Sequence, residues 1–557
     1  MERRLFSFRG GVELTAHKQE STDTPVVPAR LPPELVIPLH QHIGAPAEPL
    51  VQVGERVLKG QMIAKADGYI SAPLHASSSG WVTAIEDRPV AHPSGLHAPC
   101  IVIKTDGREE WRWRQDHGRD YTTMDPSALR NLIRDAGIVG LGGAGFPSAV
   151  KLNPGPGHVV ETLILNGAEC EPYITCDDML MRERARDVVL GLQVMRHALQ
   201  ARDCLIGVEN NKPEAAKAMR RAVAEADDPG IEVVEVPTVY PAGGEKQLIH
   251  TLTGKEVPSN GLPIQVGVVC HNVGTAAAVY RAVYLGEPLI SRYMTVAGGV
   301  AKARNLEVLI GTPITDIIDQ CHGVHATIDK LIVGGPMMGF ALHTDHAPVV
   351  KTTNCLLIST VADIPLPSRQ YAMPCIRCGK CAEVCPVYLL PQQLYWYAKA
   401  KDFDKTQDYN LFDCIECGCC DYVCPSHIPL VQYYRFAKTE IWAQEREKKK
   451  ADLARQRYEF RQERLEREKR ERAERHKRKK QALKNEPEGE PKKVEDPKKA
   501  AILAAMERAK QKKEASGVQP KNVDNLTEQQ QREIAKAESR RARRREQDSG
   551  GSDPQQE

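Results

Sequence analysis

Hydrophobic positions between residues 125 and 350 alternate between a helical and a strand-like spacing, which is the pattern of an α/β domain. Ala128, Leu129, Leu132, Ile133 and Ala136 recur at helical spacing, and a continuous apolar run of β type follows further along. The pattern predicts strands at 159–165, 204–208, 231–236 and 266–270, helices at 179–199 and 213–226, and a last helix that ends at 284.

The first hundred residues show another pattern, in which valines and leucines alternate with polar residues between 49 and 85. Four glycines, from Gly54 to Gly80, separate short strands. This pattern predicts a flattened β-sandwich in two halves, and it resembles the biotinyl/lipoyl barrel-sandwich domain. A carrier domain of that kind needs a modifiable lysine at the tip of its central hairpin, whereas Lys65 is offset from the tip at 65–68. We therefore expect an unmodified, structural module.

From about residue 440 the chain becomes rich in lysine, arginine and glutamate. Residues 443–484 mix both signs of charge and predict a long, solvated helix with i,i+4 ion pairs. The composition after residue 485 predicts disorder, interrupted by a short amphipathic helix at 498–512. The basic run 540–545 lacks stacking aromatics, so we expect a solvated tail or a docking segment and no nucleic-acid partner.

The composition of the whole chain excludes few classes of protein. The 557 residues can bury several cores without disulfides, and scattered cysteines indicate a reducing compartment. Residues 1–11 are charged and lack the apolar segment of a signal peptide, and no apolar run reaches the length that spans a bilayer. We therefore expect any membrane association to be peripheral or to occur through a partner.

Eight cysteines between residues 375 and 424 follow the spacing Cys-x2-Cys-x2-Cys-x3-Cys-Pro twice. Thiolates suit iron–sulfur clusters, whereas structural zinc usually takes Cys-x2-Cys pairs separated by a long gap. In two-cluster ferredoxins the fourth cysteine of each run binds the other cluster, so we predict two [4Fe–4S] clusters with crossed ligation. The ninth cysteine, Cys419, is expected to be a buried thiol. Cluster one would be bound by Cys375, Cys378, Cys381 and Cys424, and cluster two by Cys385, Cys414, Cys417 and Cys420.

Two loops of the α/β region carry candidate chemistry. The first, at 140–147, is glycine-rich and formally contains G-x-G-x-x-G, but the element before it is helical, whereas the dinucleotide fingerprint follows a strand. Glycines nevertheless let backbone amides approach a phosphate closely. The second loop, at 165–173, leaves a buried strand and presents Glu169 and Glu171 at its carboxyl end, where α/β sheets bind ligands.

Together these loops resemble the flavin-binding segments of the NADH-oxidising subunit of respiratory complex I, and the segments 240–245 and 271–275 extend the match. Residues 295–339 resemble the soluble ligand-binding β-grasp module that follows there. The order of modules resembles the C subunit of the Rnf-type ion-translocating electron transport complex over about residues 5–438. The implied fold is multidomain α/β: a barrel-sandwich module at 1–120, an FMN/NADH-binding core at 121–290, a β-grasp module at 291–365, a two-cluster ferredoxin domain at 366–440, and a charged helical, then disordered, tail at 441–557.

The resemblance also implies roles for single residues. Glycines of the first loop would line the crevice for the flavin phosphate and the nucleotide, and Phe146 would stack on the nicotinamide or adenine. Other residues would contact the flavin or its phosphate end, and two carboxylates would face the dinucleotide. The implied residues are Gly142, Gly143 and Gly145 in the crevice, Lys151, Asn166 and Glu169 at the flavin, Asn272 and Thr275 at its phosphate, and Glu171 and Glu245 at the dinucleotide.

The implied function is electron exchange between NADH and ferredoxin or flavodoxin through FMN and the two clusters, coupled to a sodium or proton gradient. Such a protein would lie peripherally on the cytoplasmic side of a bacterial inner membrane, bound to the other subunits of its complex. Leu141, Ala168, Gly244 and Gly274 stand where complex I has charged residues, and Tyr173 replaces a glycine. Two alternatives therefore stay open: a soluble iron–sulfur flavoenzyme that acts alone, and an electron-relay adapter with a vestigial flavin site.

Overall fold

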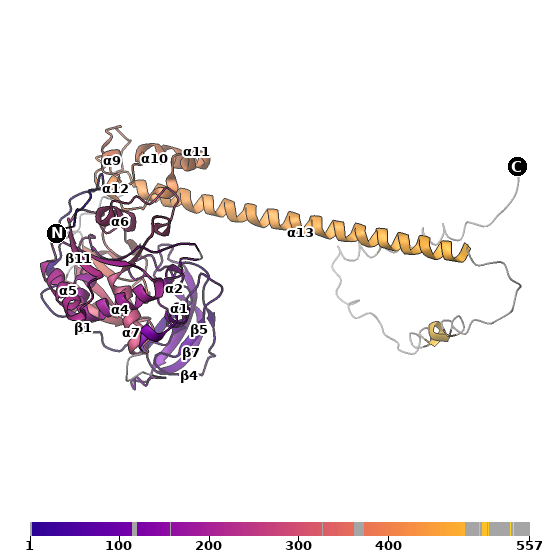
Figure 1. Cartoon of the computed structure of the whole chain (residues 1–557), viewed down its shortest axis with the longest axis horizontal. Coiled ribbons are helices and arrows are strands. Elements are labelled where there is room, and N and C mark those ends of the chain that lie inside the picture. The colour runs from indigo at the N-terminus through magenta and orange to yellow at the C-terminus, as the bar shows by residue number, and fades with distance from the viewer. Residues whose placement is uncertain are drawn as a thin grey trace, which may run out of the picture. The chain divides into compact units, whose positions relative to one another are not determined.

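The computed structural model describes residues 3–113, 120–155, 157–325, 327–360 and 372–484, and the positions 501, 504–508, 511, 535 and 539. The chain divides into two compact units, Met1–Ala451 and Asp452–Glu557. The strands and the helices that precede α13 (Leu430–Lys484) belong to the first unit. Figure 1 labels the main elements. Within the predicted helix at 498–512, the described residues 501, 504–508 and 511 are helical. The basic run 540–545 and most of the other residues after 484, where the sequence predicts disorder, lie outside the described residues.

Two antiparallel sheets form the barrel-sandwich module, and a common apolar core that includes Leu35, Val57 and Ile63 joins them. Lys65 ends one strand, and its ammonium group pairs with Glu48 at 2.9 Å on the surface. The larger sheet has the order β2 (Glu34–Pro38), β8 (His97–Thr105), β7 (Gly80–Pro89), β4 (Arg56–Val57), and the smaller sheet has the order β3 (Glu48–Pro49), β5 (Met62–Lys65), β6 (Leu74–His75).

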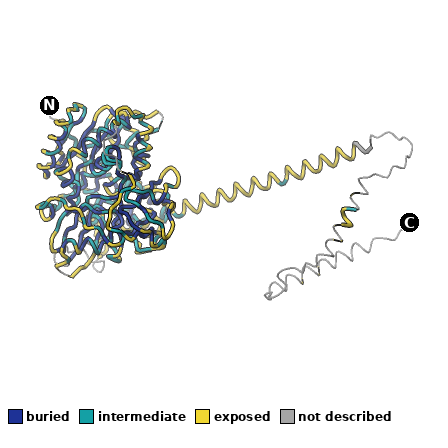
Figure 2. The backbone as a smooth tube through the Cα atoms, turned by 90° about the horizontal axis from the view of Figure 1, so that it is seen from below, coloured by how far each residue is buried: buried dark blue, intermediate teal, exposed yellow. Residues whose placement is uncertain are grey.

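The core that follows is built on a four-stranded parallel sheet. Its strands read as apolar runs because helices cover both faces. Figure 2 shows buried residues gathered inside the unit that contains this sheet, whereas the long helix is exposed. Apolar clusters pack helices on both faces of the sheet. On one face lie α1 (Pro126–Asp135), α4 (Ala185–Leu199), α5 (Pro213–Ala226) and α7 (Val273–Tyr284), and on the other lies α6 (Glu245–Thr253). The strand order is β11 (Ile231–Val236), β10 (Asp203–Glu209), β9 (Thr162–Gly167), β12 (Val268–Asn272).

Most helices of this core lie where the hydrophobic pattern predicts them, but the prediction of a single helix at 179–199 is wrong. The backbone leaves helical geometry at Arg184, with φ −129° and ψ 32°, and two helices result. No proline or glycine marks this break, so no local signal predicts it. The helices are α1 (Pro126–Asp135), α2 (Ser148–Lys151), α3 (Cys176–Glu183), α4 (Ala185–Leu199), α5 (Pro213–Ala226), α6 (Glu245–Thr253) and α7 (Val273–Tyr284).

A mixed six-stranded sheet and one helix, α8 (Ile314–Gln320), form the third module. Its first strand, β1, comes from the N-terminal segment and pairs parallel with β14, so residues far apart in the chain complete one sheet. The order is β1 (Val27–Pro28), β14 (Arg304–Leu309), β13 (Ser291–Gly298), β17 (Cys355–Thr360), β15 (Ile328–Val333), β16 (Phe340–Leu342).

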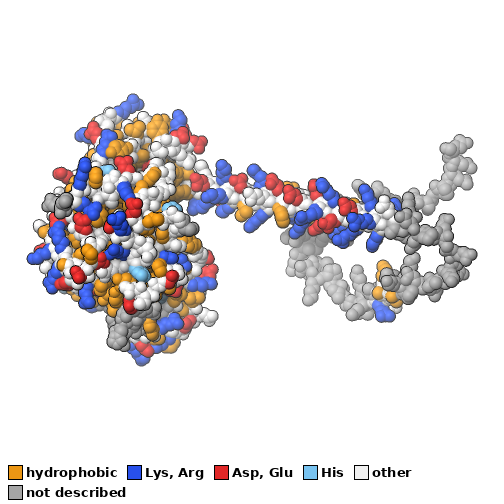
Figure 3. All heavy atoms as spheres, viewed as in Figure 1, with side chains coloured by type: hydrophobic (Ala, Val, Ile, Leu, Met, Phe, Trp, Pro, Cys, Tyr) orange, Lys and Arg blue, Asp and Glu red, His pale blue; other side chains and the backbone are white. Residues whose placement is uncertain are grey.

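Short helices and cysteine loops build the ferredoxin-like region, around an apolar core that includes Leu394, Leu411 and Tyr434. The predicted charged helix is present as α13, whose first turns pack on this core through Tyr434 and Ile441. Side chains of both signs follow one another along the rest of α13, which is exposed (Figure 3). The short helices are α9 (Lys380–Glu383), α10 (Pro391–Ala400), α11 (Phe403–Asp408) and α12 (Cys419–Tyr422). Short 3-10 turns occur at Gln19–Ser21, Tyr121–Thr123, Pro263–Val266 and Leu411–Asp413.

A helix that spans a bilayer must be both long and apolar. Among the described residues no helix combines these two properties.

Candidate functional site

Two predicted residues meet at the carboxyl edge of the parallel sheet. Asn166 of β9 and Asn272 of β12 are register partners on adjacent parallel strands, so the structure brings their segments side by side. The Asn166 amide donates to the Gly243 carbonyl at 2.7 Å. The side-chain Oδ1 of Asn272 caps α7 by accepting from the Gly274 N–H at 2.8 Å. Both amides therefore fix the loops around them.

The glycine-rich loop crosses this edge. Thr275 Oγ1 accepts from the Leu141 N–H at 3.0 Å, and a Cβ on Gly142 would lie 3.3 Å from the Cβ of Asn272. Gly145 has φ +65°, and a Cβ there would lie 2.6 Å from the Thr352 methyl group, so its role includes close packing. The loop, β9 and β12 thus form one edge of the core.

The crest of the loop has the chemistry that an anion needs. Gly142, Gly143 and Ala144 are exposed, and within the described chain their N–H groups have no hydrogen-bond partner. Gly143 has φ +111°, and a Cβ there would meet nothing within 4 Å. Open space above unpaired amides matches the phosphate of a flavin nucleotide, so these residues fit the group that the resemblance implies.

Lys151 and Glu245 form an ion pair between the end of α2 and the start of α6. The two side chains are about one-third exposed, at 30% and 40%. Phe146, at the far end of the glycine loop, is half-buried, and its carbonyl accepts from the Gly140 N–H at 2.8 Å. Lys151 and Glu245 were expected to reach different parts of a flavin–dinucleotide pair, and here they are direct neighbours.

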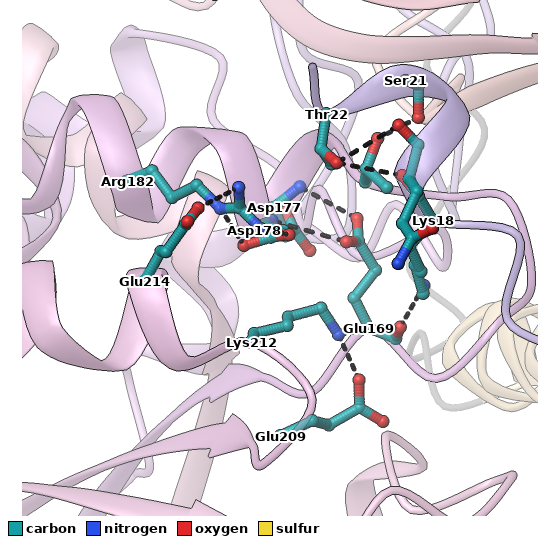
Figure 4. Close-up of polar contacts among 12 residues, drawn as sticks. Lys18, Ser21, Thr22, Glu169, Asp177, Asp178, Arg182, Glu209, Lys212 and Glu214 are labelled. Atoms are coloured by element: carbon teal, nitrogen blue, oxygen red, sulfur yellow. Dashed lines mark hydrogen bonds and ion pairs between the residues drawn. The ribbon is translucent and has the colours of Figure 1, made fainter. Parts of the chain in front are cut away.

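Glu169 has a structural contact that the sequence did not indicate. Its carboxylate accepts from the Asp177 N–H at 2.9 Å and the Asp178 N–H at 3.4 Å, and so caps the N-terminus of α3 (Figure 4). One oxygen each from Glu169 and Asp177 and the Cys176 sulfur lie within 4.8 Å of one another. Because both Glu169 oxygens accept N–H groups, the arrangement is that of a helix cap.

Lys18 holds the same loop from the other side. Its ammonium group donates to the carbonyls of Glu169, Glu171 and Ile174 at 2.5, 2.8 and 2.6 Å. Figure 4 shows the contact with Glu169. Burial lowers the pKa of Lys18, and the nearby Glu169 carboxylate opposes that shift. Sequence reasoning missed this residue, because a single lysine in an N-terminal segment has no pattern that links it to a loop 150 residues away.

The Asp177 carboxyl group is a candidate for titration near neutral pH. Burial raises the pKa of Asp177 to about 7, and the negative Glu169 adds to the shift. The Asn272 amide opposes it by donating to Asp177 Oδ2 at 2.6 Å. Asp177 therefore links the loop at 165–173, through Glu169, to β12, through Asn272. Sequence reasoning did not select this residue.

Glu171 lies beneath a loop of the third module. Its Oε1 accepts from the Met337 N–H at 2.7 Å and the Met338 N–H at 3.0 Å. Burial raises the pKa of Glu171, while these two donors and the Tyr240 hydroxyl oppose the shift. The carboxylate expected to face a dinucleotide thus contacts the loop between β15 and β16.

The eight predicted cluster ligands separate into two groups of four, each lining its own cavity. The grouping is the crossed one, because Cys424 joins the first run and Cys385 joins the second. Cys419 is buried beside the second group, as expected for a thiol outside both frames. Four thiols around one cavity fit a [4Fe–4S] cluster. One cavity is lined by Cys375, Cys378, Cys381 and Cys424, and the other by Cys385, Cys414, Cys417 and Cys420, with Cys419 as a fifth cysteine in its lining.

Four family models match the chain in the order of its modules. Residues 6–108 match the RnfC Barrel sandwich hybrid domain, 133–281 the Nuo51 FMN-binding domain, 293–341 the SLBB domain, and 371–428 the 4Fe-4S dicluster domain. The chain is thus multidomain, with the modules that its motifs predict.

Whole-chain relatives agree with these matches. The C subunit of the ion-translocating oxidoreductase complex of Pseudomonas aeruginosa is 50% identical over 465 residues, which cover 83% of this chain and 59% of that protein. The protein of the same name from Yersinia enterocolitica is 45% identical over 464 residues, with 83% and 66% covered. The chain therefore spans about three-fifths of the length of its relatives.

A solved NAD+-reducing [NiFe]-hydrogenase in the H2-reduced state is 20% identical, covers 54% of this chain and 60% of its own, and has a TM-score of 0.42. That likeness is too small to support an argument. The identities of 45–50% over 83% of the chain, with the ordered domain matches, show that the chain belongs to the family formed by the C subunits of ion-translocating oxidoreductase complexes.

Proposed function

We propose that this chain is the NADH-interacting iron–sulfur subunit of a membrane-bound, ion-translocating electron transport complex, and that it relays electrons between NADH and ferredoxin. The observation that carries the proposal is the packing of one cysteine group against the flavin-motif loop. Tyr240, Cys417 and Cys419 form one buried cluster, and Cys170 of the loop at 165–173 packs on it. A flavin and a cluster on the two sides of this contact would be neighbours.

A bound FMN would accept two electrons as a hydride and release them singly, as one-electron clusters require. The chain's residues would supply its binding. The amides of Gly142, Gly143 and Ala144 would hold the phosphate, with Asn272 and Thr275 supporting their loop. Lys151 would lie beside Asn166 and neutralise negative charge on the bound flavin. Its ion pair with Glu245 orients it at the same edge of the parallel sheet. Phe146 and Gly145 would complete the crevice.

The eight cysteines would hold two [4Fe–4S] clusters in the crossed arrangement. Partners would be the other subunits of the complex, ferredoxin or flavodoxin, and NAD(H). The protein would bind peripherally to the cytoplasmic side of the bacterial inner membrane, and high salt without detergent should release it. The boundaries expected from sequence at 120, 290 and 365 are retained in this proposal, with 365 outside the described residues. The boundary at 440 lies inside α13, whose first turns pack on the ferredoxin-like core through Tyr434 and Ile441.

The test is anaerobic purification of the full chain, followed by flavin, iron and sulfide analysis and by NADH-to-acceptor activity. The proposal expects one FMN per chain, two clusters and activity with NADH. Zinc without sulfide would refute the cluster assignment. If the chain contains iron and sulfide but no flavin, and shows no activity with NADH even in the complex, the flavin assignment is refuted while the cluster assignment stands.

A relay adapter is the second candidate, because Glu171 is covered. A Cβ on Gly335 would lie 2.0 Å from the Cγ of Glu171, so the loop at 334–339 packs directly against this side chain. Glu171→Gln distinguishes the two functions. If the chain oxidises NADH, this variant should lose NADH activity while it retains FMN and iron. If the chain is an adapter, the variant and the wild type should relay electrons from an artificial donor equally well.

A further inference from the structure

The ferredoxin-like region contacts the flavoprotein core through only part of its described surface. The Tyr240 hydroxyl donates to the Cys417 carbonyl at 2.7 Å. The next residue, Gly418, packs so closely on the third module that an added Cβ would lie 2.9 Å from the Met337 carbonyl oxygen. Both contacts fall on the loop that carries three cluster-two ligands.

Further contacts with the core flank the same cysteine group. Asp413 precedes Cys414, and its carboxylate accepts from the Ser259 hydroxyl and from the Asn260 N–H. The Val384 carbonyl, next to Cys385, accepts from the Gly11 N–H at 2.9 Å. All four cluster-two ligands therefore lie in, or directly beside, segments that touch other modules.

The loop at 373–381, which carries three cluster-one ligands, differs from the cluster-two loop in its hydrogen bonds. Within the part of the chain that the structure describes, hydrogen bonds of residues 373–381 stay inside the ferredoxin-like region: Met373 N–H donates to the Ser426 carbonyl at 2.8 Å, and Ser426 Oγ donates to the Pro374 carbonyl at 3.0 Å. Ile376 is 68% exposed and Met373 is 60% exposed. Cys378 itself is exposed, whereas Cys385, Cys417 and Cys420 are buried.

The charge of the two loops also differs. Residues 372–382 contain the exposed cations Arg377 and Lys380 and no acidic residue. Residues 413–422, around cluster two, contain three carboxylates and no cation. All three carboxylates are already engaged: Asp413 by the Asn260 N–H, Glu416 by Arg435 at 2.8 Å, and Asp421 by the Val431 N–H at 3.1 Å. The exposed face at 373–380 is therefore apolar at Met373 and Ile376 and positive around them.

We propose that cluster one is the centre that exchanges electrons with a separate protein, and that residues 373–380 are the docking face. The partner carries its own one-electron centre near its surface, beneath an apolar patch with an acidic rim, because that surface complements Ile376, Arg377 and Lys380. Cluster two is the internal centre. The step moves one electron between reduced cluster one and the oxidised centre of the partner, or the reverse, with no bond made or broken. This inference rests on the cluster assignment of the proposed function, and it needs neither NADH nor flavin.

The first test asks which cluster is accessible from solution. Cys417→Ala should retain cluster one and Cys378→Ala should retain cluster two, as iron analysis and low-temperature EPR of the dithionite-reduced full chain would show. Each variant is then mixed with stoichiometric hexacyanoferrate(III), and reoxidation of the remaining cluster is followed by stopped flow. Cluster one should react at the fast rate of the wild type, and cluster two about ten-fold more slowly because its cage is buried. Equal rates, or a faster cluster two, would overturn the proposal.

The second test keeps both clusters. Ile376→Asp and Arg377→Glu should each slow electron exchange between the dithionite-reduced chain and salt-washed membranes of the source bacterium by about ten-fold, because each removes part of the complementary face. Leu96→Asp is the matched control, since Leu96 is also 68% exposed but lies in the barrel-sandwich module. Iron content should not change in any of the three. Unchanged exchange in both face variants, or an equal loss in the control, would contradict the assigned face.

Discussion

The Tyr240 hydroxyl donates a hydrogen bond to the backbone carbonyl of Cys417 at 2.7 Å, which joins a segment of the flavin motif to a cluster ligand. Burial and the neighbouring Glu171 carboxylate raise the pKa of Tyr240, so its proton stays available for donation. Tyr240→Phe leaves the Cys417 carbonyl without this donor, at a cost of about 1–2 kcal/mol in stability. We expect unchanged iron content and slower reduction of the clusters by NADH, measured by stopped-flow bleaching. A rate equal to that of the wild type would show that this contact does not support electron transfer.

Crossed ligation predicts which cluster each cysteine supports. Cys385→Ala should lose the cluster held by Cys414, Cys417 and Cys420 and retain the other, so about half of the iron and sulfide remains. The control is Cys419→Ala, because Cys419 is buried in the same cavity but belongs to neither set. Iron analysis and EPR of the reduced protein provide the measurement. Loss of the cluster held by Cys375, Cys378 and Cys381 would show uncrossed ligation.

The open space above Gly143 predicts a specific loss of flavin. Gly143→Val should prevent the close approach of a phosphate and should cost about 1–2 kcal/mol, because a β-branched residue resists the φ of +111°. Gly54→Val is a matched control, since Gly54 has φ +89° and equally open surroundings far from the motif. Flavin content after gel filtration should fall in the first variant only. Equal retention in both would remove the glycine loop from the site.

The raised pKa of Asp177 predicts a pH dependence of stability. The folded protein keeps this proton up to about pH 7, whereas the unfolded chain releases it near the ordinary value of 3.8. The folded state therefore binds more protons between these limits, and its stability falls as pH rises, by up to about 1.4 kcal/mol per pH unit. Asp177→Asn should remove this slope. Anaerobic thermal unfolding at pH 5, 6 and 7 measures it, and parallel curves for both proteins would contradict the assignment.

Sequence alone predicts those parts of the molecule whose signals are local or repeated. The cysteine spacing predicts both groups of four, because the family pattern states which cysteine crosses over. The strands around β9 and the helix α13 follow from periodicity. The break at Arg184 has no local marker, since neither proline nor glycine stands there.

Side-chain partners were harder to predict than segments. The resemblance places Glu169 and Glu171 at a ligand, yet one caps α3 and the other accepts N–H groups from Met337 and Met338. These contacts join residues more than 150 positions apart or depend on how a helix begins, and Lys18 is a further example. Long-range contacts of this kind leave no periodic signal in one sequence.

The central claim is that electrons from NADH reach the clusters through a flavin bound at the edge of the parallel sheet. The direct measurement is low-temperature EPR of the anaerobically purified full chain after addition of NADH, compared with addition of dithionite. The account predicts that NADH produces the reduced-cluster signal in the wild type, and that the signal is lost in Gly143→Val until dithionite is added. A wild type that dithionite reduces but NADH does not, alone or in its complex, would contradict the account and leave the chain as a relay adapter.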